Sequence, residues 1–220
     1  WCKSYEVSGF RNWWKKMISI VDYGLGNVRA FENIYKRLGL SLQIVKTASE
    51  LNRASKIILP GVGAFDWALN RLHESGMTEA LNNLVINKKV PVLGVCVGMQ
   101  IMAHSSDEGK LPGLGWIDGE VKRFDETLLK QKTHLPHMGW NTVRTINSSR
   151  LFKGIHNPKY YFLHSYYLKL NDDKKVVGTS NYGIQFASAI ESDNIFATQF
   201  HPEKGHELGI KLLKNFVDFC

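Results

Sequence analysis

Short apolar runs alternate with amphipathic stretches along the first half of the chain. The runs are rich in Ile, Val and Leu, as is typical of strands buried on both faces, while the stretches between them repeat apolar residues at helical spacing. Asn27 precedes the first such stretch and is a suitable N-cap residue. Alternation of this kind builds a mostly parallel sheet with helices on both faces. We predict strands at 18–23, 40–45, 56–60 and, in the centre of the sheet, 90–96, and helices at 28–38, 67–74 and 77–87.

The second half of the chain, from about residue 110, has a different pattern. Strand-like runs such as GWIDGEVKRF and KYYFLHSYYLKL follow one another with short turns, which indicates antiparallel pairing. A last strand and loop are expected at 194–203, and a terminal helix at 205–219. The pattern therefore predicts a single α/β domain over residues 17–220, with three layers, a central mostly parallel sheet and a β-rich second half.

The first sixteen residues differ from the rest of the chain. They contain three of the six tryptophans, show no periodic pattern and end just before Met17. They also lack the apolar segment of a secretory signal. We interpret residues 1–16 as an N-terminal extension, either natural or introduced by cloning.

Composition and charge exclude several classes of protein. The net charge of the 220 residues is +8, but the basic residues are spread among acidic ones, so a nucleic-acid partner is not expected. No run approaches the roughly 20 apolar residues of a membrane span. The three cysteines lie far apart, which predicts neither a disulfide framework nor a metal site and suits a cytoplasmic location.

Cys96 is the candidate nucleophile. It ends the run at 90–96 within the sequence GVCVG, in the strand–turn–helix context of a nucleophile elbow. A tight turn of this kind needs small neighbours, which Gly94 and Gly98 provide. For an arbitrary cysteine, burial as a small hydrophobic residue is the commoner role, and the two glycines favour the nucleophile here.

A cysteine nucleophile needs a base and a group that orients the base. His201 ends a strand-like run, and Glu203 follows two residues later. A histidine in this place could also be an ordinary surface residue. Val62 stands between two glycines after the third strand, where its peptide could turn toward an oxyanion. Phosphate loops, a complete dinucleotide fingerprint and zinc spacing are missing from the sequence, so we expect a thiol hydrolase without cofactor or metal.

Seven motifs occur in a familiar order: VDYGLGN, LPGVGAF, GVCVGMQ, DEG, LPHMGWN, YFLHSYY and QFHPEKG. With them the chain resembles the class I (triad) glutamine amidotransferases, whose fold is flavodoxin-like. Within this family it is most similar to the glutaminase subunits of imidazole glycerol phosphate synthase and their surface-polysaccharide paralogues. The resemblance extends from Met17 to Cys220.

The resemblance implies a role for each site residue. Cys96 attacks the side-chain amide of L-glutamine, His201 acts as base and then acid, and Glu203 orients His201. The backbone N–H groups of Val62 and Val97 bind the oxyanion, and no cofactor or metal takes part. The positions implied to hold glutamine are Gly63, Gln100, Glu108, Ser165 and Tyr166.

The resemblance also implies a partner, a (β/α)8-barrel cyclase that forms a heterodimer with the glutaminase and receives its ammonia. Positions implied to contact this partner are Met138, Trp140, Tyr161 and Lys204. The ammonia would serve the formation of imidazole glycerol phosphate and AICAR in histidine biosynthesis. Two alternatives stay open: amidation of a surface-polysaccharide sugar, which the segment around Trp116 resembles, and a free-standing hydrolase of γ-glutamyl compounds. A binding subunit without catalysis is disfavoured by the complete triad.

Overall fold

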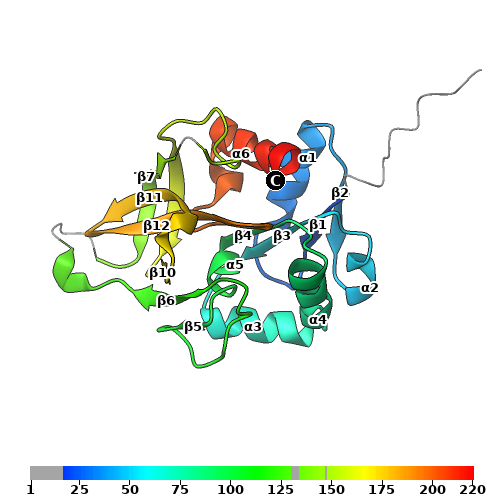
Figure 1. Ribbon diagram of the computed structural model, residues 1–220, viewed down its shortest axis with the longest axis horizontal. Coiled ribbons are helices and arrows are strands. Elements are labelled where there is room, and N and C mark those ends of the chain that lie inside the picture. Colours follow the sequence, from blue (N-terminus) through cyan, green and yellow to red (C-terminus); the bar gives the residue numbers. More distant parts are fainter. Residues whose placement is uncertain (1–16, 130–133, 147) are drawn as a thin grey trace, which may run out of the picture.

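The computed structural model describes residues 17–129, 134–146 and 148–220. The predicted extension at 1–16 lies outside the described residues. A sheet with strand order β2-β1-β3-β4-β13-β12-β11-β8 crosses the middle of the molecule (Figure 1). The first five strands in this order run parallel to one another. Each of the other three pairs antiparallel with the strand before it in the order. Their bounds are Leu42–Val45, Ile18–Val21, Lys56–Gly61, Val92–Cys96, Ile195–Thr198, Ile184–Ser192, Val176–Tyr182 and Arg144–Thr145.

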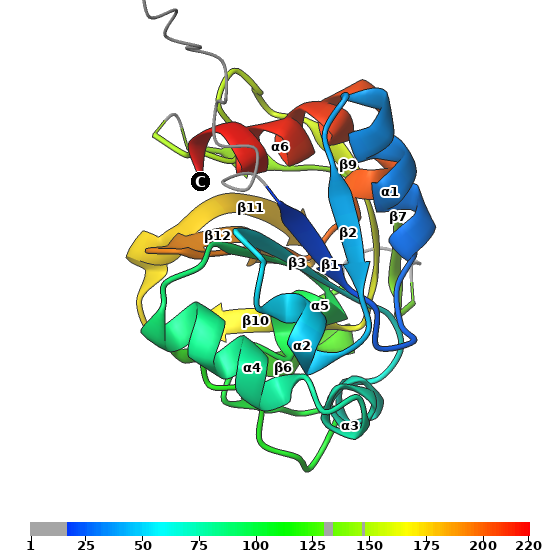
Figure 2. The same ribbon diagram turned by 90° about the vertical axis from the view of Figure 1, so that its right-hand side faces the viewer.

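Helices cover both faces of this sheet. Helices α1 (Val28–Arg37) and α6 (His206–Phe219) lie on one face, and α2, α3 and α4 lie on the other (Figure 2). The bounds of these last three are Ala48–Leu51, Phe65–Glu74 and Thr78–Asn82. The arrangement confirms the predicted three-layer α/β fold with a central, mostly parallel sheet.

The chain beyond residue 100 is rich in strands, as the pattern predicts. A three-stranded sheet contains β10 (Tyr166–Leu170), β6 (Gly119–Arg123) and β5 (Ser105–Ser106), and β7 (His137–Thr142) pairs antiparallel with β9 (Lys159–His164). Among the described residues, 3-10 turns follow β6 at Glu126–Leu128, β10 at Asp173–Lys175 and β13 at Pro202–Lys204.

Some predicted elements differ from the structure. The helix predicted at 77–87 is α4 followed by a π-helical segment, Asn83–Asn87. Helix α2 was not predicted, although Thr47 and Glu50 form a capping box at its start. The strand and loop predicted at 194–203 are β13 (Ile195–Thr198) and the turn after it, in which Pro202 begins a 3-10 segment. Asn27 caps α1 as predicted, accepting a hydrogen bond from Ala30 N at 3.2 Å.

None of the helices among the described residues has the length and apolar character to cross a bilayer. Within the same residues, no group of three His, Cys, Asp or Glu side chains is gathered as a metal ion would require.

Candidate active site

Cys96 lies at the end of β4, immediately before the short helix α5 (Val97–Gln100). Its backbone has φ 58° and ψ −116°, a region that residues with a Cβ rarely adopt. Such strain, of order 1–3 kcal/mol, persists only where the surroundings impose it. The side chain is buried, so its sulfur lies inside the molecule and not on an open surface.

Glycines impose this turn by allowing β4 and α5 to approach β3. A Cβ on Gly98 would lie 2.0 Å from Leu59 O, and one on Gly94 would lie 2.8 Å from Gly98 O. Real Cβ atoms do not approach backbone atoms as closely as either of these two distances. Only glycine therefore fits at positions 94 and 98. The sequence argument for two small residues around Cys96 therefore agrees with the packing.

His201 and Glu203 are joined directly. Nδ1 of His201 lies 2.8 Å from Glu203 Oε1, and both side chains are buried. The turn at Pro202 folds the carboxylate back onto the ring. The other carboxylate oxygen, Oε2, has no hydrogen-bond partner among the residues that the structure describes.

The charge state of His201 depends on both of its neighbours. Burial alone lowers the pKa of His201, but hydrogen bonds with Cys96 and Glu203 and the attraction of their charges outweigh burial and raise the pKa to about 10. Because Nδ1 faces Glu203, the ring nitrogen that remains for Cys96 is Nε2. The three side chains therefore form one chain, with a charged imidazole between two acidic groups.

A cavity of about 280 Å³ opens beside Cys96. It brings together most of the predicted site residues, namely Val62, Gly63, Cys96, Val97, Gln100, Ser165, Tyr166 and His201. Pro136, Leu163 and His164 also line it, although sequence reasoning did not select them. The sequence could have indicated these three residues, because they belong to the motifs LPHMGWN and YFLHSYY.

The loop after β3 lies against the elbow. Gly61 pairs with Cys96 in the parallel ladder between β3 and β4, which places Val62 next to the sulfur. The hydroxyl of Tyr23 donates to Pro60 O at 2.6 Å and holds the start of this loop. Gly63 has φ +90°, a value that favours glycine.

Gln100 and Glu108 have different surroundings. Gln100 is buried, and its Nε2 donates to Tyr166 O and to Gln199 Oε1, both at 3.0 Å. Gln199 in turn points its Nε2 at the Cys96 sulfur, 3.9 Å away. Glu108 does not line the cavity: its Oε2 accepts from the first N–H of α3, that of Phe65, at 2.8 Å. Burial raises the pKa of the Glu108 carboxyl, and Asp66 adds to the rise.

The four residues implied at a partner contact lie together at the surface. Met138 is 66% exposed and Trp140 is 50% exposed. The Trp140 ring lies edge-on to Tyr161, with centroids 6.2 Å apart, and Lys204 Nζ lies 4.5 Å from the centre of the Tyr161 ring. We call Met138, Trp140, Tyr161 and Lys204 the β7–β9 patch. It adjoins the cavity, because Leu163 pairs with Met138 and lines the cavity wall.

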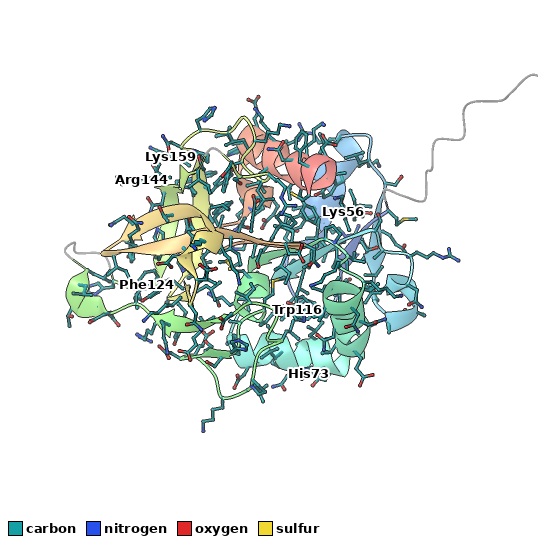
Figure 3. The ribbon with its side chains drawn as sticks, in the orientation of Figure 1. Lys56, His73, Trp116, Phe124, Arg144 and Lys159 are labelled. Carbon is teal, nitrogen blue, oxygen red and sulfur yellow. The ribbon has the colours of Figure 1, made fainter. Side chains whose placement is uncertain are left out.

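Two other residues with side chains capable of binding lie away from the cavity. His73 is exposed on α3 (Figure 3). Trp116 is buried, and its indole N–H donates to Asn82 Oδ1 at 2.7 Å. The side chains of Trp116 and Ile117 are therefore part of the core.

A family model described as glutamine amidotransferase class-I matches residues 19–219. The chain belongs to this family. Among class-I glutamine amidotransferases, the imidazole glycerol phosphate synthase subunit HisH of Bdellovibrio bacteriovorus is 53% identical over 203 residues, covering 92% of this chain and 100% of that protein. HisH of Leptospira interrogans is 51% identical over 202 residues, covering 91% and 99%.

Solved structures with the same fold are more distant in sequence. A crystal structure of a glutamine amidotransferase superposes with a TM-score of 0.71 at 17% identity, covering 91% of this chain and 97% of that one. PurLQS from Thermotoga maritima gives a TM-score of 0.68 at 17% identity, covering 92% and 98%. These likenesses confirm the predicted fold class.

Proposed function

We propose that this class-I glutamine amidotransferase is the glutaminase subunit of an imidazole glycerol phosphate synthase in histidine biosynthesis. The relatives at 51–53% identity over nearly the whole chain support this assignment, since both are named as that subunit. The observation that supports the chemistry is the Cys96–His201–Glu203 chain beside a cavity of about 280 Å³.

The first half of the reaction forms a thioester. The Cys96 thiolate attacks the side-chain amide carbon of L-glutamine, and the backbone N–H groups of Val62 and Val97 stabilise the oxyanion. His201 gives its Nε2 proton to the amide nitrogen, which leaves as ammonia. The γ-glutamyl group stays on the sulfur.

The second half regenerates the enzyme. Now neutral, His201 takes a proton from water, which attacks the thioester carbon and releases glutamate, and the thiolate and imidazolium re-form. Glu203 holds the ring orientation through Nδ1 in both halves. Gly63, Gln100, Ser165 and Tyr166 line the cavity where glutamine binds. Glu108 does not line it and is bound instead to the first N–H of α3.

The ammonia passes to a (β/α)8-barrel cyclase that docks on the β7–β9 patch. This patch is an exposed apolar surface with a cation at its edge, and it adjoins the cavity. A partner seated there covers the mouth of the site and keeps the ammonia from water. Trp116 lies in the core, so its side chain takes no direct part in recognising an acceptor or a partner.

The test measures glutamate release from L-glutamine by the chain alone and with the barrel subunit and its acceptor ligand. We expect low activity alone and a steep rise in the complex. Cys96→Ser should abolish glutamate release, while the complex still uses added ammonia. Cys220→Ser is the matched control, because Cys220 is a second cysteine remote from the cavity. High activity alone, unchanged by the partner, would contradict the proposal and favour a free-standing hydrolase.

A further inference from the structure

A chain of hydrogen bonds links the cavity wall to β7 through two buried histidines. Nδ1 of His164 lies 2.7 Å from Tyr166 O, and Nε2 of His164 lies 2.8 Å from Nδ1 of His137. Nε2 of His137 lies 3.2 Å from Nδ2 of Asn141, which also donates to Asn181 O at 2.9 Å. The chain therefore reaches from the cavity to β11.

Only one arrangement of protons satisfies all of these contacts. A carbonyl oxygen can only accept, so His164 has its proton on Nδ1 and accepts at Nε2. His137 must then donate from Nδ1 and accept at Nε2 from Asn141. The amide of Asn141 is fixed in that orientation because its Oδ1 accepts from Thr142 N at 2.8 Å. Both rings are neutral, and the donor of each histidine points along the chain toward Tyr166.

Aromatic side chains enclose the two imidazoles. Phe162 and Tyr182 stack on His137, with ring centroids 4.8 Å and 4.2 Å away. Phe124, which follows β6 (Figure 3), packs edge-on against His164. Burial lowers the pKa of His137 to about 4 and, together with the neighbouring His137, lowers that of His164 to about 3. Neither ring therefore becomes charged near neutral pH.

At the cavity end, the carbonyl of Tyr166 accepts two hydrogen bonds. One comes from His164 and the other, at 3.0 Å, from Gln100 Nε2. Ser165 lies between His164 and Tyr166, so the backbone of this segment is held from both sides. His164, Ser165 and Tyr166 all line the cavity.

At the other end, the chain begins on a strand with two different faces. His137 and Asn141 project inward from β7, whereas Met138 and Trp140 project outward and are exposed. This alternation is the ordinary two-residue period of a strand. A shift of β7 caused by contact on its outer face must therefore move the donors on its inner face.

We propose that His164 and His137 are positioning residues that hold the glutamine-binding segment 164–166 and tie it to the strand whose outer face docks the partner. The inference rests on the proposed function. His164 and His137 affect the affinity for glutamine and the degree to which that affinity depends on the partner. They take no direct part in the proton transfers at Cys96.

The decisive variant is His137→Phe, which keeps an aromatic ring between Phe162 and Tyr182 but removes both hydrogen bonds. In the complex with the barrel subunit, we expect the KM for L-glutamine to rise about tenfold while kcat changes much less. We also expect the stimulation by the partner to fall, measured as the ratio of glutamate release with and without it.

Conservative replacements and a packing control make the test specific. His164→Asn places an amide donor where Nδ1 stood, whereas His164→Leu has no donor, so the asparagine variant should recover most of the glutamine affinity. Phe186→Leu changes the ring packing against both histidines without removing a hydrogen bond. Its KM should stay within about twofold of the wild type.

Two results would overturn the inference. One is an unchanged KM and an unchanged partner stimulation in a folded His137→Phe chain. The other is an equal rise of KM in Phe186→Leu, which would assign the effect to packing. If His137→Phe fails to fold, Asn141→Leu, at a half-buried position, decides in the same way. It leaves both histidines in place and removes the donor to His137, together with the hydrogen bonds to Asn181 O and from Thr142 N. A wild-type complex that released no glutamate would instead refute the proposed function.

Discussion

Cys96 and His201 are held in place by different means. Cys96 owes its position to backbone, because a positive φ is forced by close glycine contacts on both sides. His201 owes its position to side chains, through Glu203 on one nitrogen and Cys96 on the other. Replacing the glycines next to Cys96 should therefore change the stability of the fold. Replacing Glu203 should change the protonation of His201.

Glu203→Gln should change both activity and the pH dependence of stability. Loss of the carboxylate charge lowers the pKa of His201 and loosens the ring, so glutamate release should fall about 100-fold or more. With its folded pKa raised to about 10 from 6.5, His201 stabilises the wild-type fold fully below pH 6.5, and this contribution is lost as the pH rises through about 10.

Urea unfolding at intervals across this pH range measures the effect. In Glu203→Gln the loss of stability should move to lower pH and become smaller. A variant with the same pH profile as the wild type would show that Glu203 does not support the charge on His201.

Single residues could be predicted from the sequence where their partners are near in the chain or share a motif. His201 and Glu203 are two residues apart, and Cys96 has its glycines beside it. His164 and His137 were missed because 27 residues separate them, and only the pairing of β7 with β9 brings them together. Gln199 was missed for a similar reason, since its partner Gln100 is on another element.

Among the elements, β3 and β4 determine the geometry of the site. Their parallel pairing sets Gly61 beside Cys96, and the elbow crosses so close to β3 that a Cβ cannot fit at Gly98. The same pairing brings Val62 and Val97 to one cavity. The position of the oxyanion site, a role still to be tested, therefore follows from strand register.

Gly98→Ala should destabilise the fold by about 3 kcal/mol or more, because its Cβ would lie 2.0 Å from the Leu59 carbonyl oxygen. Gly39→Ala is the matched control, with φ +68° and no atom within 4 Å of the added Cβ, and should cost only the 1–2 kcal/mol of a left-handed backbone. Urea unfolding compares the two. Equal losses would mean that the elbow relaxes to admit the methyl group.

Elements with a strong hydrophobic period were predicted well, and short ones were not. The apolar face of α1 and the buried run of β4 both identify their elements without tertiary information. Helix α2 has only four residues, too few to show a period. The pattern of apolar residues predicts a helix around Asn83 but does not distinguish an α-helix from the π-helix that begins there.

On the scale of the whole molecule, the cavity and the β7–β9 patch share one side. The patch is built on strands from the β-rich second half, while the nucleophile is on the parallel half of the sheet. The family fold and the order of motifs predicted this division, and the match to the family model over residues 19–219 confirms the family. The sequence could not show which face of β7 is exposed, because Met138 and Trp140 on that face are apolar and resemble core residues.

Trp140→Ala should weaken binding of the barrel partner without unfolding the chain. Trp140 is half-exposed in the proposed docking surface, and a tryptophan buried by a partner contributes strongly to binding, so the dissociation constant should rise about 30-fold or more. Trp67→Ala is the matched control, since Trp67 is 55% exposed on α3 and lies outside the patch. Calorimetric titration and thermal unfolding of both variants measure the effect. A loss of stability in Trp140→Ala as large as its loss of affinity would make Trp140 a core residue.

The backbone N–H of His201 donates to Tyr161 O at 3.0 Å, in an isolated bridge between the two residues. Tyr161 belongs to the patch, so the surface proposed for recognition and the residue proposed to move protons share a main-chain contact. This bond survives any replacement of the Tyr161 side chain, because both of its atoms are main-chain atoms. The surface can therefore change its side chains for a new partner, while a displacement of the β9 backbone would carry His201 with it.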